Sequence, residues 1–448
     1  MLAIKTSYEL TDFLFGSQYL SSAHMRLEIG DPAKHTTVRR KMDDLERNQK
    51  ALEEFFESSR FINAFDSDGA RANFALSLMA EDGYLLRKVS DSVAASANES
   101  PLVVWLTMPY FSLVEHETRR AFASQFAVKL ARVSESINEI RNYAKIELKD
   151  GVSSYVAACE AYLHGLYGTD VCSSKLLCEV VLDDSIPLGL THLLAFGFGA
   201  DHFVEEAKKS DNLAAQKLGT DNMIAALPNY SLSLLKHGSH AKALREGNLK
   251  IGMYDMREVF CLDVNSESNL DAAISLYLSS YLCIFNLMCY MINYCYFNDL
   301  LFLKYSLFHF QSFVNGVSNL NKYYYCKKGR SSKLLNDCML SRLDRNRINR
   351  LRKVRNALVH YDFHEWNTLS LLHPRESFSD AIYSCSGYSL LSQVDFLKGL
   401  VLDTAETILL SLGANRLLHV SSLCPGEDSC IISDNDLVLT IASEFWLG

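Results

Sequence analysis

Hydrophobic positions recur at helical spacing along most of this chain. Near the start, five large apolar residues between positions 42 and 56 fall three or seven residues apart or side by side, namely Met42, Leu45, Leu52, Phe55 and Phe56. A second apolar stripe runs from Phe122 to Ala144, and the opposite side of the same predicted helix carries Arg, Lys, Glu and Ser. Such spacing is typical of helices that bury one face. We expect a helix of about 25 residues there, ended by Asp150 and Gly151, within a largely helical first 265 residues.

Few segments carry the pattern of a strand. Residues 101–106 (PLVVWL) and 250–264 (with KIGMY and EVFCLDV) hold β-branched and aromatic residues between helix-breaking flanks. They predict at most a few short strands. Since strands and helices do not alternate regularly, a doubly wound nucleotide-binding domain is not favoured.

Hydrophobicity rises sharply after the polar stretch at residues 265–273, and we predict a domain boundary there. Four apolar-striped helices are expected beyond it, at about 272–298, 300–320, 334–361 and 390–412. The stripe of the third repeats almost as a heptad with Arg347 in one slot, its apolar members being Leu340, Leu343, Leu351, Val354, Leu358 and Tyr361. The predicted architecture is therefore mainly α, with an N-terminal region of residues 1–265, a helical domain of 266–413 and an extension of 414–448.

Residues 272–298 contain no charged side chain, and this length could span a bilayer. The run nevertheless includes Asn286, Asn293, three serines and five tyrosines, and basic residues do not flank it closely. A buried central helix is favoured over a membrane span, which stays open as the less favoured alternative.

Composition fits a folded protein of two or three units, with 448 residues, 48% hydrophobic and 22% charged. Twelve cysteines form no Cys-x-x-Cys pair, and the chain does not open on a secretory signal. These features predict the reducing cytoplasm.

Net charge is −9, which by itself disfavours a nucleic-acid partner, but the distribution reverses this inference. Between Lys322 and Arg355 stand twelve lysines and arginines against two aspartates, so the remainder carries about −19. A solvated helix face is the plain interpretation of such a run, and a surface for RNA phosphates is the functional one.

The basic segment ends in LRKVRNALVHYDF, residues 351–363, where Arg355, Asn356 and His360 stand close together. On a helix Asn356 and His360 share a face, whereas Arg355 lies about 140° from His360. A long side chain, a distorted last turn or a second copy of the chain must bring the guanidinium to the imidazole.

This cluster resembles the Arg-x4-6-His signature of the HEPN superfamily, and the resemblance covers about residues 266–413. It implies a four-helix bundle that acts as a metal-independent endoribonuclease at a homodimer interface. It further implies a toxin or antiviral defence role, RNA as substrate with transfer RNA one candidate, and a regulatory or antitoxin protein partner. The alternative within the superfamily is a non-catalytic module that binds a nucleotide or a protein.

The residue types suit this chemistry. His360 can transfer protons near neutral pH, Arg355 can offset charge on a phosphate, and Asn356 can orient either group. The neighbouring cations are expected to follow the RNA backbone without sequence preference, namely Arg345, Arg347, Arg350, Arg352 and Lys353.

Other candidate motifs are weak. His116-Glu117 begins a metalloprotease-like string, but Arg120 replaces the second histidine, so we expect ordinary helix surface. His237 and His240 have no nearby carboxylate or thiol, and the chain contains no phosphate-binding loop signature. The sequence therefore predicts no metal and no cofactor.

Overall fold

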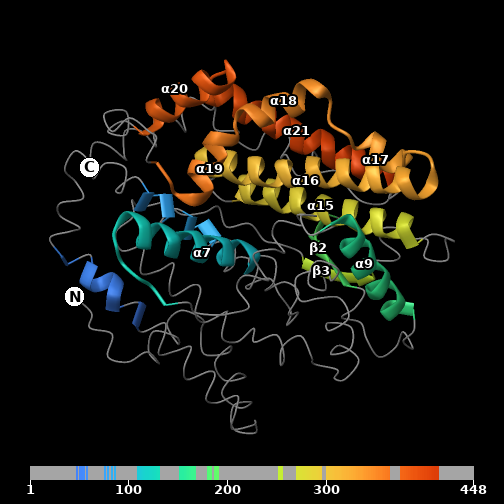
Figure 1. Cartoon of the computed structure of the whole chain (residues 1–448), viewed down its shortest axis with the longest axis horizontal. Coiled ribbons are helices and arrows are strands. Elements are labelled where there is room, and N and C mark those ends of the chain that lie inside the picture. The colour runs from blue at the N-terminus through green and yellow to red at the C-terminus, as the bar shows by residue number, and fades with distance from the viewer. Residues whose placement is uncertain are drawn as a thin grey trace, which may run out of the picture.

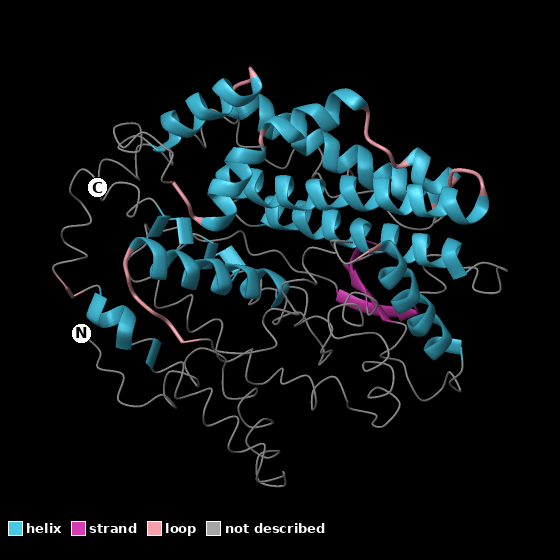
Figure 2. Cartoon of the chain, in the orientation of Figure 1, coloured by secondary structure: helices cyan, strands magenta, loops and turns pink. Residues whose placement is uncertain are grey.

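The computed structural model describes the chain in separate stretches. They cover most of 47–58, single positions between 75 and 86, and residues 108–131, 151–167, 179–183, 186–190, 251–255, 269–294, 299–363 and 374–412. Within these stretches the protein is mainly α with three short strands, as predicted (Figures 1 and 2). The extension of 414–448, the residues of 101–106 and most of the stripe from 122 to 144 lie outside the described part.

Two long helices form the centre of the described helical core. Helix α15 (Asn269–Tyr294) and helix α16 (Asp299–Lys328) lie side by side, and α21 (Leu390–Ser411) packs against both (Figure 1). Aromatic rings of α15 and α16 interlock, with Phe285 stacked on Phe310 at a centroid separation of 4.8 Å. The window Leu270–Met288 is long and apolar enough to cross a membrane, but 89% of it is buried inside the fold.

The prediction of one continuous helix at about 334–361 is wrong, because three short helices occupy this range. Helix α17 (Lys333–Asp337), α18 (Arg342–Arg350) and α19 (Arg352–His360) follow one another. Helices α17 and α18 each begin with a serine N-cap. The Ser332 hydroxyl accepts a hydrogen bond from the N–H of Leu335, and the Ser341 hydroxyl accepts one from the N–H of Asp344. Leu351 is buried and bends the chain between α18 and α19. This bend turns the apolar sides of both helices onto α16.

The connection after α19 leads to α20 (Pro374–Ser386), which the apolar pattern did not predict as a helix. It packs on α18 and α21 at the upper edge of the molecule (Figure 1). Helix α21 begins where the Ser389 hydroxyl accepts from the N–H of Ser392. Its range agrees with the predicted helix at 390–412.

Segments from the first 265 residues pack directly on the later helices. Helix α7 (Met108–Gln125) contacts α19, and α9 (Val152–Tyr167) contacts α15. A three-stranded antiparallel sheet of order β2-β1-β3 also lies against α15. Its strands are β1 (Glu179–Asp183), β2 (Ile186–Leu190) and β3 (Ile251–Asp255). One hydrophobic core thus includes described residues from both sides of position 265.

Two local predictions in the N-terminal region can be compared with these elements. The strand expected at KIGMY is confirmed as β3. The helix expected to continue from Phe122 is wrong between 126 and 131, because α7 ends at Gln125 and Ala127 takes a positive φ of 53°. The chain turns there, so that Phe126 and Phe122 both pack on Phe55.

Candidate active site

The predicted cluster lies at the carboxyl end of α19. Val354, Ala357, Leu358 and Val359 are buried and hold the helix to its neighbours, whereas the polar positions Arg355, Asn356 and His360 are only partly exposed. His360 is the last helical residue. Its side chain is 36% exposed, and Tyr361 follows in the left-handed conformation with a φ of 51°.

Glu117 of α7 meets this histidine within one chain. The Nδ1 atom of His360 lies 2.9 Å from Oε2 of Glu117, and the carboxylate is only 4% exposed. Arg120, one turn further along α7, donates to the same oxygen at 3.2 Å. A buried carboxylate therefore joins a histidine of α19 to an arginine of α7.

The environment of Glu117 favours its ionised form. Burial by itself would raise the pKa of this carboxyl, but the hydrogen bond and the electrostatic interaction with His360, followed by the electrostatic interactions with Arg120 and His116, outweigh burial. The net effect is a pKa below the ordinary value of 4.5. An ionised Glu117 can only accept, so Nδ1 of His360 carries the proton and Nε2 is the atom available to a substrate.

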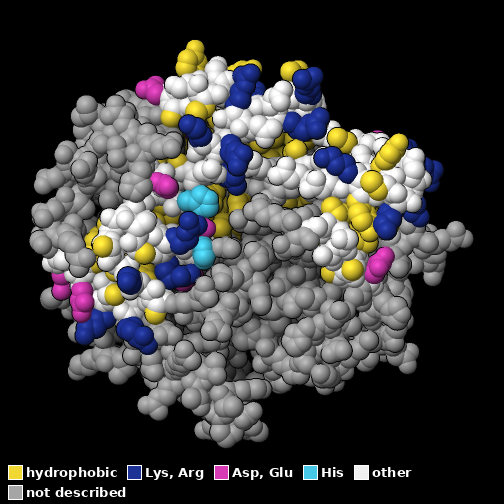
Figure 3. All heavy atoms as spheres, in the orientation of Figure 1, with side chains coloured by type: hydrophobic (Ala, Val, Ile, Leu, Met, Phe, Trp, Pro, Cys, Tyr) yellow, Lys and Arg dark blue, Asp and Glu magenta, His cyan; other side chains and the backbone are white. Residues whose placement is uncertain are grey.

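A second histidine adjoins the same carboxylate. Nε2 of His116 lies 3.9 Å from Oε1 of Glu117, and Nδ1 of His116 lies 3.2 Å from the Arg119 guanidinium. Arg119 in turn forms an ion pair with Glu115 at 3.2 Å. The space-filling view shows histidine side chains close to Lys and Arg side chains on this face of the molecule (Figure 3).

The other predicted residues of the cluster stay near His360 but differ in exposure. Arg355 and Asn356 are half-buried on α19, and Asn356 is one turn before His360, on the same side of the helix. Arg352 and Lys353 are exposed at the start of α19, and Arg350 is exposed at the end of α18. Arg350 also donates to the carbonyl of Ser386 at 3.5 Å.

The geometry does not support the predicted phosphate contact of Arg347. Its guanidinium carbon lies 4.0 Å from the ring centroids of both Tyr388 and Phe396. It also donates to the side chain of Gln393 at 2.8 Å and to the carbonyl of Ser392 at 2.8 Å. These contacts tie α18 to α21 and explain an arginine in the apolar stripe.

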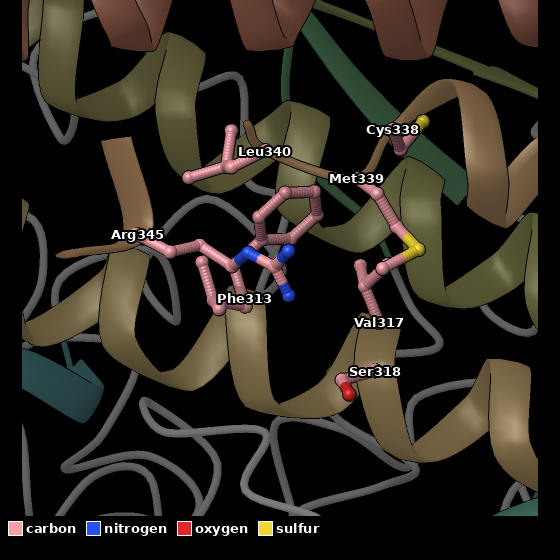
Figure 4. A pocket seen from close by; sticks show the side chains of 8 residues that line it. Phe313, Val317, Ser318, Cys338, Met339, Leu340 and Arg345 are labelled. Carbon is pink, nitrogen blue, oxygen red and sulfur yellow. The ribbon is translucent and has the colours of Figure 1, made fainter. Parts of the chain in front are cut away.

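Arg345 of α18 contacts a different part of the fold. It lines a small pocket together with Phe313, Val317 and Ser318 of α16 and with residues 338–340 (Figure 4). Its Nε atom is buried and makes no hydrogen bond within the described part of the chain. The prediction that Arg345 follows an RNA backbone therefore applies at most to the outer end of its guanidinium.

Sequence reasoning missed Glu117, which we interpreted as ordinary helix surface. The informative signal is its position among apolar neighbours, because Leu113, Glu117 and Ala121 are four residues apart and all are buried. A carboxylate in a buried stripe of a helix requires a partner. The partner is 243 residues away in sequence, so helical spacing could not name it.

Within the described residues, no three His, Cys, Asp or Glu side chains gather as a metal site would require. Comparison of the chain with family models, with curated protein sequences and with solved structures gives no match in any of the three.

Proposed function

We propose that the protein is a metal-independent endoribonuclease with His360 as its proton-transfer group. The observation that carries the proposal is the hydrogen bond from His360 to the buried, ionised Glu117. A carboxylate that fixes one ring nitrogen of a histidine leaves the other in a defined position for acid or base catalysis. The Arg-x4-6-His resemblance points to RNA as the substrate.

Cleavage would proceed by internal transfer within the RNA. The ribose 2′-oxygen attacks the adjacent phosphorus and loses its proton, and the bond from phosphorus to the 5′-oxygen breaks as that oxygen gains a proton. The products are a 2′,3′-cyclic phosphate and a 5′-hydroxyl. Nε2 of His360 takes or gives one of these protons, while Arg355 offsets charge on the phosphate oxygens.

The cations around the histidine would hold the RNA backbone. Arg350, Arg352 and Lys353 are exposed at the α18–α19 junction, and Arg120 of α7 is 60% exposed beside Glu117. Binding through such residues reads phosphates rather than bases, so we expect affinity that falls steeply with salt. Arg120 adds an N-terminal residue to this surface.

The resemblance supplies the wider setting of the proposal. A cytoplasmic homodimer would bring a second Arg355 and His360 to the same phosphodiester. The arginine of one protomer could then act with the histidine of the other, although the two residues lie about 140° apart on one helix. A toxin or antiviral effector that cuts RNA such as transfer RNA, restrained by a protein partner, is the corresponding role.

The test is cleavage of labelled RNA in the presence of EDTA. Wild-type protein should give fragments with 2′,3′-cyclic phosphate ends, whereas His360→Ala and Arg355→Ala should each lose about 10²-fold or more in rate. Arg330→Ala is the matched control. It removes an exposed cation beyond the far end of α16, and the rate should stay near that of wild type.

An equal absence of cleavage in wild type and variants, over a range of RNAs, contradicts the nuclease. If the same proteins still bind RNA or a nucleotide in a salt-dependent way, the non-catalytic binding module takes its place. Circular dichroism of each variant confirms that the fold is intact.

A further inference from the structure

A buried polar cluster surrounds Tyr361, the residue that directly follows His360. Its members come from three parts of the chain, namely Asp82, the neighbours Lys304 and Tyr305 of α16, and Tyr361 itself. All four side chains are almost completely buried. None of them belongs to the proposed catalytic group.

Asp82 is the centre of this cluster. Oδ1 accepts from the Tyr305 hydroxyl at 2.8 Å, and Oδ2 accepts from the Tyr361 hydroxyl at 2.6 Å and from the Lys304 ammonium. The ammonium also lies 3.1 Å from the Tyr361 oxygen and 4.4 Å from the centroid of its ring. Hydrogen bonds therefore hold the hydroxyl oxygen of Tyr361, and the Lys304 ammonium lies against the face of its ring.

The backbone of Tyr361 is held as well. Its carbonyl accepts from the side-chain amide of Gln125, at the end of the helix that supplies Glu117. Its φ of 51° is a conformation that residues other than glycine seldom adopt, so surrounding contacts must maintain it. Helix α7 thus holds the chain at two consecutive positions, His360 through Glu117 and Tyr361 through Gln125.

We propose that Tyr361 is a positioning residue, which through Asp82 and Gln125 fixes the end of α19 so that the His360 imidazole stays on Glu117. The inference rests on the proposed function for its catalytic consequence, but the placement of the ring can be measured without it. The N-terminal region would then hold the histidine of the C-terminal helices in place.

Two tyrosines on one carboxylate provide a matched pair of variants. Tyr361→Phe and Tyr305→Phe each remove one buried hydroxyl that donates to Asp82, so their losses of stability should be similar. Only the first should loosen α19. We expect kcat for RNA cleavage to fall about tenfold or more in Tyr361→Phe with KM unchanged, and to stay near wild type in Tyr305→Phe.

Nitrogen NMR of the His360 ring in the full-length protein supplies a measurement that needs no activity. Wild type and Tyr305→Phe should keep the neutral ring in the form with the proton on Nδ1, whereas Tyr361→Phe should show a mixture of the two tautomers. Identical His360 spectra in the two variants would overturn the inference. A wild type that is inert on RNA would remove the proposed function alone, because the spectra would still decide this point.

If Tyr361→Phe does not fold, Gln125→Ala tests whether the end of α19 positions His360. This change removes the hydrogen bond from the half-buried Gln125 side chain to the carbonyl of Tyr361. The expected result is again mixed His360 tautomers. An unchanged His360 signal in Gln125→Ala would then overturn the inference.

Discussion

At the scale of single residues, the proposed function depends on how one carboxylate is kept charged in a buried position. Glu117 loses hydration on burial, and His360 and Arg120 replace it with two hydrogen bonds on the same oxygen. The charge of Glu117 in turn sets which nitrogen of His360 faces a substrate. The pair is therefore a unit, and a change in either member should affect the other.

Glu117→Gln tests the charge while keeping the size of the side chain. Because glutamine cannot stabilise a positive imidazole, we expect the rate of RNA cleavage at neutral pH to fall about 10²-fold or more. Glu115→Gln is the matched control, since Glu115 is equally buried on α7 but pairs with Arg119. Equal rates in the two variants would contradict the role of Glu117.

The same variant makes a prediction about stability and pH. Since the folded-state pKa of Glu117 is depressed, its ionised form contributes stability that is complete above the unfolded-state pKa and is lost as pH falls through the folded-state pKa. The difference in free energy of unfolding between wild type and Glu117→Gln should therefore shrink below pH 4.5. Urea unfolding at several pH values measures it, and a difference that grows on acidification would contradict the assignment.

At the scale of elements, the close approach of α15 and α16 depends on one glycine. A Cβ atom built at Gly316 of α16 would lie 1.8 Å from the hydroxyl oxygen of Tyr277, a fully buried residue of α15. That hydroxyl donates to the carbonyl of Phe313 at 3.4 Å, so the ring has little room to move. The pair explains why a helix of 30 residues tolerates a glycine in its interior.

Gly316→Ala should destabilise the protein by about 1–3 kcal/mol, because the overlap with Tyr277 exceeds the gain in helix propensity. Gly399→Ala in α21 is the matched control. Nothing lies within 4 Å of its built Cβ, so this change should stabilise by up to about 1 kcal/mol. Unfolding in urea gives both values, and a neutral Gly316→Ala would show that α15 and α16 separate readily.

Apolar periodicity predicted the long helices of the C-terminal part, but it did not predict where the chain bends between short helices. The helices expected at 272–298, 300–320 and 390–412 correspond to α15, α16 and α21, although α16 continues to Lys328, eight residues beyond its predicted end. The predicted helix at 334–361 is interrupted twice, after Asp337 and at Leu351, and Leu351 continues the apolar stripe although it marks the bend. Hydrophobicity alone cannot distinguish a buried bend from a buried turn of helix.

At the scale of the whole molecule, the contacts that complete the site join residues far apart in the chain. His360, Arg355 and Asn356 could be selected from local spacing, because all three stand on one short helix. Glu117 and Asp82 could not, since their partners lie more than 220 residues away. A carboxylate alone in an apolar stripe indicates only that some partner exists.

The buried pair of Asp82 and Lys304 gives the last prediction, on how the N-terminal segment is held. Burial lowers the pKa of Lys304 and Asp82 opposes that change, so the ammonium depends on this carboxylate. Asp82→Asn leaves a buried cation without its counter-charge and should cost about 3–5 kcal/mol in unfolding free energy. Lys304→Met in the same protein should restore a large part of that loss, because it removes the stranded charge. Urea unfolding of wild type, both single variants and the double variant gives the coupling energy. A double variant whose loss equals the sum of the single losses would show that the two groups are independent, and that the ion pair does not hold the N-terminal segment.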